Sequence, residues 1–227
     1  MSEWDDLADW WSEELTDPAY TFDVQPLVDK MLAGLSGPSL DLGCGTGRLR
    51  DSLPVPAYGC DSSRKLLAIA AELGMPVVQT RLAELPWRDG VIATAVACLV
   101  LEHLPDLRTF FSEVARVVTS GGHLVVVSNH PAYTSQGSGP VVDMSDGEVL
   151  WRWGSYLFES VATEPAGEGS MVFHHRPLPV ILNAAAEAGW SLERMLEAGV
   201  SAETVARIPA LAGQEHMPRL IALRWRR

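Results

Sequence analysis

The sequence has few basic residues, no paired cysteines and no long apolar run. Its 227 residues include 17 Lys and Arg against 29 Asp and Glu, which gives a formal net charge of -12. Nucleic acids and anionic membranes are bound by clusters of Lys and Arg, and the C-terminal Arg-Trp-Arg-Arg is more typical of a strand end and tail than of such a cluster. We therefore expect neither a nucleic acid nor a membrane as a partner.

The cysteine content and the N-terminal residues bear on the compartment and on metal binding. Cys44, Cys60 and Cys98 form no C-x-x-C pair and lie in apolar or glycine-rich surroundings, which favours reduced thiols inside the cell over a disulfide framework. The acidic first residues lack the basic region of a secretory signal, and no apolar run approaches the ~20 residues that span a bilayer. We expect a cytoplasmic protein, and the spacing of the histidines and cysteines predicts no metal site.

Two nucleotide-binding signatures are also missing. No G-K-[ST] follows the glycines, which excludes a P-loop. Gly43, Gly45 and Gly47 are spaced G-x-G-x-G, whereas a dinucleotide fingerprint has its third glycine one residue later. Together with the lack of a Tyr-x-x-x-Lys pair, this spacing disfavours an NAD-dependent oxidoreductase.

Short apolar runs and helical segments alternate up to residue 129. The runs lack the polar–apolar alternation of half-exposed strands and are separated by helices, which predicts a parallel sheet buried on both faces. The predicted helices cover residues 3–15, 23–35, 62–74 and 106–118, and the predicted strands cover residues 38–43, 57–60, 75–79, 91–100 and 123–129.

This rhythm breaks after residue 129. Residues 130–148 are rich in Gly, Ser and Pro and predict a long loop, and two strand-like runs at 155–161 and 170–175 predict a hairpin. A helix at 178–188 and two further strands at 191–197 and 219–225 complete the chain. We expect a single domain with four parts: N-terminal helices or lid (1–36), a cofactor-binding core (37–129), a substrate-side insertion (130–177), and a C-terminal helix with strands (178–227).

The glycines and Asp61 together predict an adenosyl ligand. Glycines after a strand allow a ligand to lie on the backbone, a following helix offers free N–H groups, and such turns lie at the carboxyl edge of an α/β sheet, where ligands bind. Asp61 ends the second predicted strand, where a carboxylate can accept hydrogen bonds from both hydroxyls of a ribose.

Five blocks of sequence carry a family resemblance: LDLGCGTG (40–47), YGCD (58–61), LAELPW (82–87), CLVLEHLPD (98–106) and ARVVTSGGHLVVVSNHP (115–131). In this order they resemble the class I S-adenosylmethionine-dependent methyltransferases, above all the small-molecule branch that includes the menaquinone and ubiquinone biosynthesis-type enzymes. The resemblance covers roughly residues 4–226. It implies a Rossmann-like α/β fold whose seven-stranded, mostly parallel sheet has helices on both faces, with an N-terminal helical lid and a loop or hairpin inserted after strand five.

The resemblance also implies an enzyme that transfers a methyl group from S-adenosyl-L-methionine to a small molecule, in biosynthesis or secondary metabolism, with S-adenosyl-L-homocysteine as product. An alternative stays open, in which the fold binds the cofactor but catalyses a non-methylating reaction or acts as a binding partner. Both a monomer and a homodimer are compatible with the sequence.

Carried over by position, the family's roles give a set of expected cofactor contacts. Arg81, Ala93 and Ser120 depart from the family pattern, and of these Arg81 bears on the adenine contacts. The resemblance implies that the methionine part of the cofactor is held by Asp41, Gly43, Cys44, Gly45 and Gly47, that the ribose is bound by Asp61 and Ser62, and that the adenine is flanked by Leu82 and Ala83. It also implies that Cys98 and Leu99 face the methyl group and that Trp11 and Tyr20 belong to a lid. His103 is expected to make structural or cofactor-side hydrogen bonds.

Residues for the acceptor side are predicted from chemistry. A sulfonium methyl is already activated, so the protein has to align the acceptor and exclude water, and a base helps only when the acceptor must lose a proton. His130, His174 and His175 are candidates for a base or an acceptor contact, and because neighbouring strand residues point to opposite faces, at most one of the last two enters a pocket. The tryptophans at 4, 10, 11, 151 and 153 either wall an aromatic acceptor pocket beneath the 130–175 insertion or pack the N-terminal helices onto the sheet.

Overall fold

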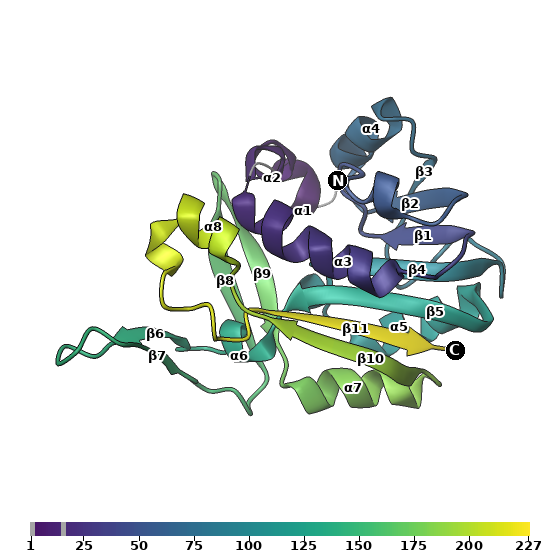
Figure 1. Cartoon of the computed structure of the whole chain (residues 1–227). Coiled ribbons are helices and arrows are strands. Elements are labelled where there is room, and N and C mark those ends of the chain that lie inside the picture. The colour runs from purple at the N-terminus through teal and green to yellow at the C-terminus, as the bar shows by residue number, and fades with distance from the viewer. Residues whose placement is uncertain (1–2, 15–16) are drawn as a thin grey trace.

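A computed structural model of the chain describes residues 3–14 and 17–227. Its centre is a seven-stranded sheet of order β10-β11-β5-β4-β1-β2-β3, with helices on both faces (Figure 1). Strands β1 to β5 are parallel, and β11 runs antiparallel to both β5 and β10. The strands are β1 Ser39–Leu42, β2 Ala57–Asp61, β3 Val77–Gln79, β4 Ile92–Cys98, β5 Val118–Asn129, β10 Ser191–Ala198 and β11 Leu220–Arg226. The expected α/β architecture, with its antiparallel last strand, is confirmed.

The helices follow the predicted order with shifted ends. The predicted helix 3–15 is divided into two helices at Leu7, and residue 15 lies outside the described residues. The predicted helix 23–35 begins later, after a π-helical turn, and ends at Leu32. Pro26 suits the first turn of that helix, where its missing N–H has no partner to lose. The helices are α1 Glu3–Asp6, α2 Ala8–Glu14, α3 Gln25–Leu32, α4 Arg64–Glu72, α5 Leu107–Val117, α6 Pro131–Thr134, α7 Leu178–Glu187 and α8 Ala202–Arg207, with short turns η1 Tyr20–Val24, η2 Arg50–Ser52, η3 Leu101–His103 and η4 Pro209–Leu211.

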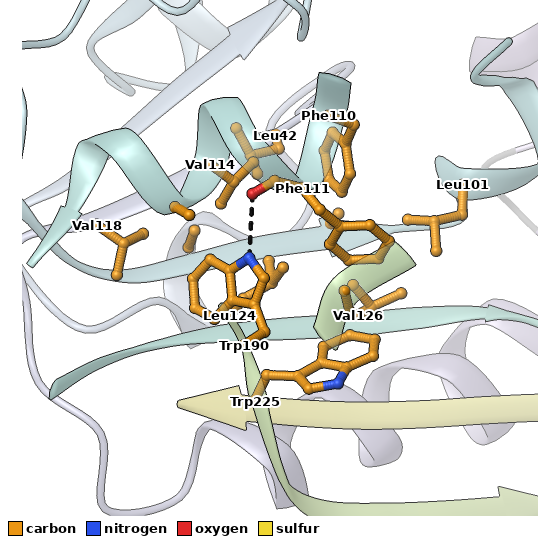
Figure 2. Close-up of a cluster of buried hydrophobic side chains, with 14 of the residues drawn as sticks. Leu42, Leu101, Phe110, Phe111, Val114, Val118, Leu124, Val126, Trp190 and Trp225 are labelled. Carbon is orange, nitrogen blue, oxygen red and sulfur yellow. Dashed lines mark hydrogen bonds between the residues drawn. The ribbon is translucent and has the colours of Figure 1, made fainter. Parts of the chain in front are cut away.

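Apolar side chains on both faces of the sheet form the core. On one face, α5 and α7 pack against the sheet through Phe110, Phe111 and Trp225, and the Trp190 indole donates a hydrogen bond of 3.0 Å to the Phe111 carbonyl (Figure 2). On the other face, Val28 and Met31 of α3 are fully buried. Each such side chain contributes about 1.5–3 kcal/mol by burial. Because both faces are covered, every residue of β1 is buried, which explains why the strands show no polar alternation.

The insertion contains two hairpins where the sequence predicts a loop and one hairpin. β6 Gly139–Val142, inside the predicted loop, pairs with β7 Val149–Arg152, which follows that loop directly, and this hairpin extends away from the body of the molecule (Figure 1). Its turn is closed by Asp143, whose side chain accepts from the Ser145 amide at 2.8 Å while its carbonyl accepts from Gly147. Asp and Gly are turn formers, so the loop prediction was wrong because it treated them only as breakers.

The hairpin predicted from the runs at 155–161 and 170–175 is present, but the ends of its strands differ from the prediction. β8 Ser160–Ala166 pairs with β9 Gly169–His175, so the first strand begins five residues later than predicted. Its two-residue turn needs Gly167, which has a φ of +57°, and a Cβ at this glycine would lie 2.9 Å from the Cβ of Trp10. The tip of the hairpin therefore packs on α2, and the insertion and the N-terminal helices cover the same edge of the sheet.

Apolar side chains join these two covering segments. Leu7 of α1–α2 packs with Ala166 and Met171 of the hairpin, and the His103 ring lies 5.0 Å from the Trp4 ring and 4.7 Å from the Phe173 ring. In the described ranges, no helix combines the length and the apolar character needed to cross a membrane.

Candidate functional site

The glycine loop follows β1 at the carboxyl edge of the sheet. Gly43, Gly45 and Gly47 have φ values of +75°, +52° and +80°, which only glycine adopts at little cost. A Cβ at Gly43 would lie 2.7 Å from the Val100 side chain, whereas one at Gly45 would meet nothing nearer than the Trp11 indole nitrogen at 3.8 Å. Gly45 therefore presents bare backbone beneath Trp11.

The segment after the glycines differs from the expected α-helix. Turns continue to Leu49 and lead into the short 3-10 turn η2. The prediction that a helix N-terminus follows the loop was wrong: turns follow it, and the amides of Gly43, Gly45 and Gly47 donate to the Cys60 carbonyl, the Asp61 carboxyl and the Cys44 carbonyl. The glycine spacing alone does not distinguish a loop followed by an α-helix from a loop followed by turns, because both begin with glycines in the same left-handed backbone conformation.

Asp61 at the end of β2 is directly bonded to the glycine loop. Its Oδ2 accepts from the Gly45 amide at 3.0 Å and its Oδ1 accepts from the Ser63 amide at 2.8 Å. Burial raises the pKa of Asp61, and the bonds from Ser63 and Gly45 oppose that rise. Ser62 lies beside it, half-buried, with its carbonyl bonded to Gln79. The two motifs that the sequence analysis paired are in contact.

A second buried carboxyl lies one strand away. Asp41 on β1 is 2% exposed, and burial, with the nearby Asp61 adding to it, raises its pKa to about 7. Burial also raises the pKa values of the Cys44 and Cys60 thiols. All three cysteines are free, as the sequence predicts, and the raised thiol pKa values make them poor nucleophiles.

A cavity of about 140 Å³ lies at this edge, between the N-terminal segment and the strand ends. Leu99, after β4, has a φ of +55° and is the non-glycine residue with a left-handed backbone in the described part of the chain; such strain is concentrated at functional sites. The walls are Trp10, Trp11, Asp17, Ala19, Tyr20, Asp23 and Val24 from the N-terminal segment, Arg48 after the glycines, Leu99, Asn129 after β5, and Arg219 and Leu220 at β11.

Aromatic and charged groups line the end of the cavity near the glycines. The Arg48 guanidinium lies 3.4 Å from the centre of the Tyr20 ring, a cation–π contact. Burial lowers the pKa of Arg48 and raises the pKa of Tyr20. Cys98 shares a side-chain hydrogen bond with Tyr20 and raises the Tyr20 pKa further. The expected lid residues Trp11 and Tyr20 and the expected strand-four residue Leu99 thus meet around one cavity.

His130 and His175 do not line this cavity. His130 accepts from the Ala132 amide at 3.0 Å through Nδ1, and its Nε2 lies 2.8 Å from Glu197; burial lowers its pKa, and Glu197 opposes the shift. His175 contacts the Thr134 hydroxyl at 3.2 Å and the Tyr156 carbonyl at 2.9 Å. Both nitrogens of each ring are engaged in holding the insertion, and no contact supports a role as base.

His174 and His103 also lie away from the cavity. His174 lines a second, smaller hollow together with Glu102 and Arg176, and burial, followed by Arg176 and His103, lowers its pKa. His103 lies 3.1 Å from the Val172 carbonyl through Nδ1 and packs the hairpin onto Trp4, which favours the structural half of its expected role.

The predicted aromatic pocket is only half formed. Trp10 and Trp11 line the cavity. Trp151 instead stacks on Tyr133, with ring centres 5.4 Å apart, and donates to the Ala132 carbonyl at 3.1 Å, while Trp153 is 55% exposed. The insertion tryptophans therefore do not reach the cavity, because residues of α6 lie between.

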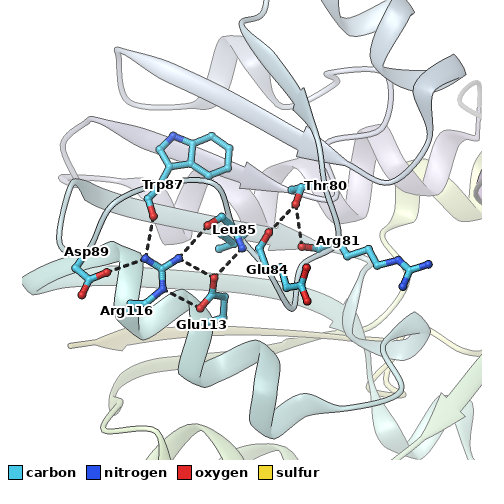
Figure 3. A network of polar contacts seen from close by, with 8 residues as sticks. All are labelled: Thr80, Arg81, Glu84, Leu85, Trp87, Asp89, Glu113 and Arg116. Carbon is cyan, nitrogen blue, oxygen red and sulfur yellow. Dashed lines mark hydrogen bonds and ion pairs between the residues drawn. The ribbon is translucent and has the colours of Figure 1, made fainter.

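The predicted adenine residues lie on a braced loop after β3. Leu82 is half-buried and Ala83 is exposed. The Arg116 guanidinium on α5 donates to the carbonyls of Leu85 and Trp87 at 2.9 and 2.8 Å, and it pairs with Glu113 and Asp89 (Figure 3). The sequence analysis missed this brace, although the i, i+3 spacing of Glu113 and Arg116 on one helix gives a signal for it.

Eight of the residues that line the cavity were also missed, among them Asp23, Arg48, Asn129 and Arg219. Arg48 follows the glycines directly, so its position gave a signal. Asp23, Asn129 and Arg219 come from an N-terminal turn, the end of β5 and the start of β11, and nothing in the local sequence connects them.

Comparison with known proteins agrees with this geometry. Residues 40–126 match the methyltransferase domain family. A ubiquinone biosynthesis O-methyltransferase from Alkalilimnicola ehrlichii is 34% identical over 118 residues, or 45% of this chain and 48% of that protein, and the chain spans about half the length of the curated relatives it matches.

Solved structures match over more of the chain. An S-adenosylmethionine-dependent methyltransferase from Mesorhizobium loti aligns with a TM-score of 0.77 and 26% identity over 89% of this chain and 96% of that one. A structure from Listeria monocytogenes aligns with a TM-score of 0.73 at 18% identity over 88% of this chain and 95% of that one, a likeness of fold. Residues 40–126 thus resemble a methyltransferase domain, and most of the chain is similar in fold and sequence to an S-adenosylmethionine-dependent methyltransferase of known structure.

Proposed function

We propose that this chain transfers a methyl group from S-adenosylmethionine to a small-molecule acceptor. The observation that carries the proposal is the contact between Asp61 and the Gly45 amide at 3.0 Å, on a loop that lies beneath Trp11, one of the residues that line the cavity. The ubiquinone biosynthesis O-methyltransferases among the relatives support an acceptor of this class. The free, buried thiols also support our placement of the protein in the cytoplasm.

The residues present fit the cofactor. The Gly45 backbone is bare where a Cβ would meet only Trp11, Asp61 offers carboxylate oxygens for ribose hydroxyls, and Arg48 provides a cation beside the loop for a carboxylate. Asp41 is the acidic group next to which an ammonium or sulfonium is stabilised. When bound, S-adenosylmethionine supplies a methyl group on a positively charged sulfur.

The chain's own part in the reaction is positioning and exclusion of water. Trp10, Trp11 and Tyr20 form one wall of the cavity, and the strained Leu99 backbone forms another. Such walls hold the reacting groups in line and keep water out. Because both nitrogens of His130 and His175 are engaged elsewhere, we propose that neither removes a proton from the acceptor.

Calorimetric titration with S-adenosylhomocysteine tests the cofactor site. Asp61→Asn is expected to weaken binding at least about tenfold, since hydrogen bonds to a charged carboxylate are lost. Asp51→Asn is the matched control, because Asp51 is exposed and contacts only its neighbour Arg50 among the described residues. Equal affinity in the two variants, or tighter binding of NAD than of S-adenosylhomocysteine by the wild type, contradicts the assignment.

Transfer is tested separately. Methyl-labelled S-adenosylmethionine is incubated with pools of small hydroxy, amino and amide compounds, and label in a product supports the proposal. Cofactor binding without transfer to any pool contradicts it and favours the alternative of a non-methylating protein.

A further inference from the structure

Asp5 bonds the N-terminal helices to the start of α4. This carboxylate on α1 is 6% exposed, and its Oδ1 accepts from the Ser63 hydroxyl at 2.9 Å and from the Lys65 amide at 3.3 Å. Ser63 is the N-cap of α4, and its hydroxyl also accepts from the Leu66 amide at 3.3 Å. Because a negative charge is stabilised at the N-terminal end of a helix, the ionised form of Asp5 suits this position.

The same serine is bonded to the carboxylate that we propose for the ribose. The Ser63 amide donates to Asp61 Oδ1 at 2.8 Å, and Asp61 Oδ2 accepts from the Gly45 amide at 3.0 Å. A Cβ at Gly45 would lie 3.8 Å from the Trp11 indole nitrogen, so Trp11 of α2 covers the glycine loop. Asp5 and Trp11 therefore attach the two N-terminal helices to the cofactor side at two points, one on α4 and one on the loop.

The N-terminal helices are held by different kinds of contact on their two sides. Towards the insertion the contacts are apolar, with Leu7 packed against Ala166 and Met171 of the β8–β9 hairpin. Towards α4, the bonds to Asp5 are polar. A polar group can exchange a protein partner for water at a small net cost, whereas separating apolar surfaces costs free energy in proportion to their area. The side bonded to α4 is thus the one that opens more easily.

We propose that Asp5 is a positioning residue that holds α1 and α2 over the glycine loop, and that the cofactor enters and leaves only when the bonds from Asp5 to Ser63 and Lys65 are open. We call these bonds the latch. Segments that cover a site exclude water and set the rate of ligand exchange. This inference rests on the proposed methyl-transfer function, since it requires the cofactor to lie on the loop beneath Trp11.

The latch predicts a particular kinetic signature. Because the cofactor enters and leaves through the same opened state, weakening the latch speeds both steps by the same factor and leaves the dissociation constant unchanged. A residue that binds the cofactor directly, such as Asp61, acts differently, because its loss raises the dissociation constant. A variant that merely lowers the fraction of folded protein reduces the amplitude of the binding signal and changes neither rate constant.

The test follows S-adenosylhomocysteine binding to the full chain by stopped-flow tryptophan fluorescence. Asp5→Ala is expected to raise the association and dissociation rate constants about tenfold each, because losing a hydrogen bond to a charged group raises the population of the opened state by about this factor. The dissociation constant from calorimetry is expected to stay within about threefold of the wild-type value.

Three further variants complete the test. Asp5→Asn keeps an oxygen that accepts from Ser63 and Lys65, so it is expected to restore both rate constants to within about threefold of the wild type. Asp6→Ala is the matched control, because Asp6 is the exposed neighbour of Asp5 on α1, and it is expected to leave both rates unchanged.

Ser63→Ala removes the other partner of the latch and is expected to speed both steps as Asp5→Ala does. Its control is Ser201→Ala, which removes the N-cap of α8 and is expected to leave the rates unchanged. Should Asp5→Ala fail to fold, this pair of serine variants decides the question in the same way.

The outcomes separate this inference from the proposed function. If Asp5→Ala exchanges S-adenosylhomocysteine at the wild-type rates, if it raises only the dissociation rate, or if Asp5→Asn is as fast as Asp5→Ala, the latch is overturned and the cofactor site stands. If S-adenosylhomocysteine itself does not bind to the folded wild type, the proposed function is overturned first.

Discussion

The proposed cofactor side and the proposed acceptor side of this molecule are built in different ways. On the cofactor side, Gly45 and Asp61 meet because β1 and β2 are neighbouring parallel strands, and their contact involves a backbone amide. On the acceptor side, which we place at the cavity wall, Asp23, Asn129 and Arg219 come from an N-terminal turn and from two strands far apart in the chain. The first pair is set by the neighbouring strands themselves, whereas the second group depends on packing between distant segments.

Two buried titratable groups, Asp41 and His130, differ in the direction in which burial shifts their pKa values. Asp41 is buried beside another carboxyl, which raises its pKa to about 7, whereas burial lowers the pKa of His130. The neutral form of each group is favoured in the folded state. The dependence of stability on pH therefore has opposite signs for the two groups, because Asp41 is an acid and His130 is a base. Ionisation of Asp41 lowers stability as pH rises, and protonation of His130 lowers it as pH falls.

The largest expected effect concerns Asp41 at high pH. Its folded pKa of about 7 exceeds the ordinary value of 3.8, so its contribution is fully present below pH 3.8 and is lost as pH rises through 7, at a cost on the order of a few kcal/mol. Asp41→Asn is therefore expected to raise the stability of the ligand-free protein at pH 8 and to give a smaller gain at pH 5. Denaturant unfolding at the two pH values measures this. A gain equal to that of Asp29→Asn, at an exposed carboxylate on α3, would show that burial at Asp41 has no cost.

Two glycine variants separate backbone strain from ligand contact. Gly45 and Gly34 both have positive φ values, and a Cβ at Gly34 would meet nothing within 4 Å. Alanine at either position is expected to cost about 1 kcal/mol of stability. Only Gly45→Ala is expected to weaken S-adenosylhomocysteine binding by more than tenfold, or about 1.4 kcal/mol. Calorimetry that finds the same affinity for both variants would place the cofactor away from this loop.

Removal of the Arg116 brace is expected to loosen the adenine loop. Arg116→Gln loses two carbonyl bonds and two ion pairs, with an expected stability loss of about 1–2 kcal/mol because the guanidinium is partly exposed. Arg108→Gln on the same helix breaks an exposed pair with Glu187 and is expected to cost less than about 0.5 kcal/mol. Hydrogen exchange should quicken at residues 80–89 in the first variant only. Similar exchange in both would show that the loop is held by other contacts.

The smallest effect belongs to His130, which lies outside the cavity, against Glu197 and Ala132. Its lowered pKa means that its contribution to stability is present above the ordinary value of 6.5 and is lost as pH falls below it. His130→Gln is expected to flatten the fall in stability between pH 7 and pH 5, whereas His216→Gln, at an exposed position, leaves it unchanged. Thermal unfolding across this range measures the difference. An unchanged slope in His130→Gln would mean that the ring is not stabilised in its neutral form.

Much of the fold was predictable because its signals are local. Continuous apolar runs identified β1 and β4, and a capping aspartate precedes α5, where Asp106 accepts from the Arg108 amide at 2.9 Å. The β6–β7 hairpin was missed because its strands are short and its Asp-Gly turn resembles a loop. The start of β8 was misplaced because pairing with β9, and not the composition of 155–159, decides the register.

The sequence by itself determined the order of the strands of the central sheet and of the helices packed on it, together with the pairing of the glycine loop with Asp61, since residue periodicity and turn chemistry depend on near neighbours. Only the tertiary structure decided which side chains reach the cavity. It engaged His130 and His175 in hydrogen bonds away from the cavity, and it placed Asp23 and Arg219, 196 positions apart in the chain, on the wall of one cavity. The physical reason is that a side chain's partners are set by packing across the sheet edge, where contacts are long-range.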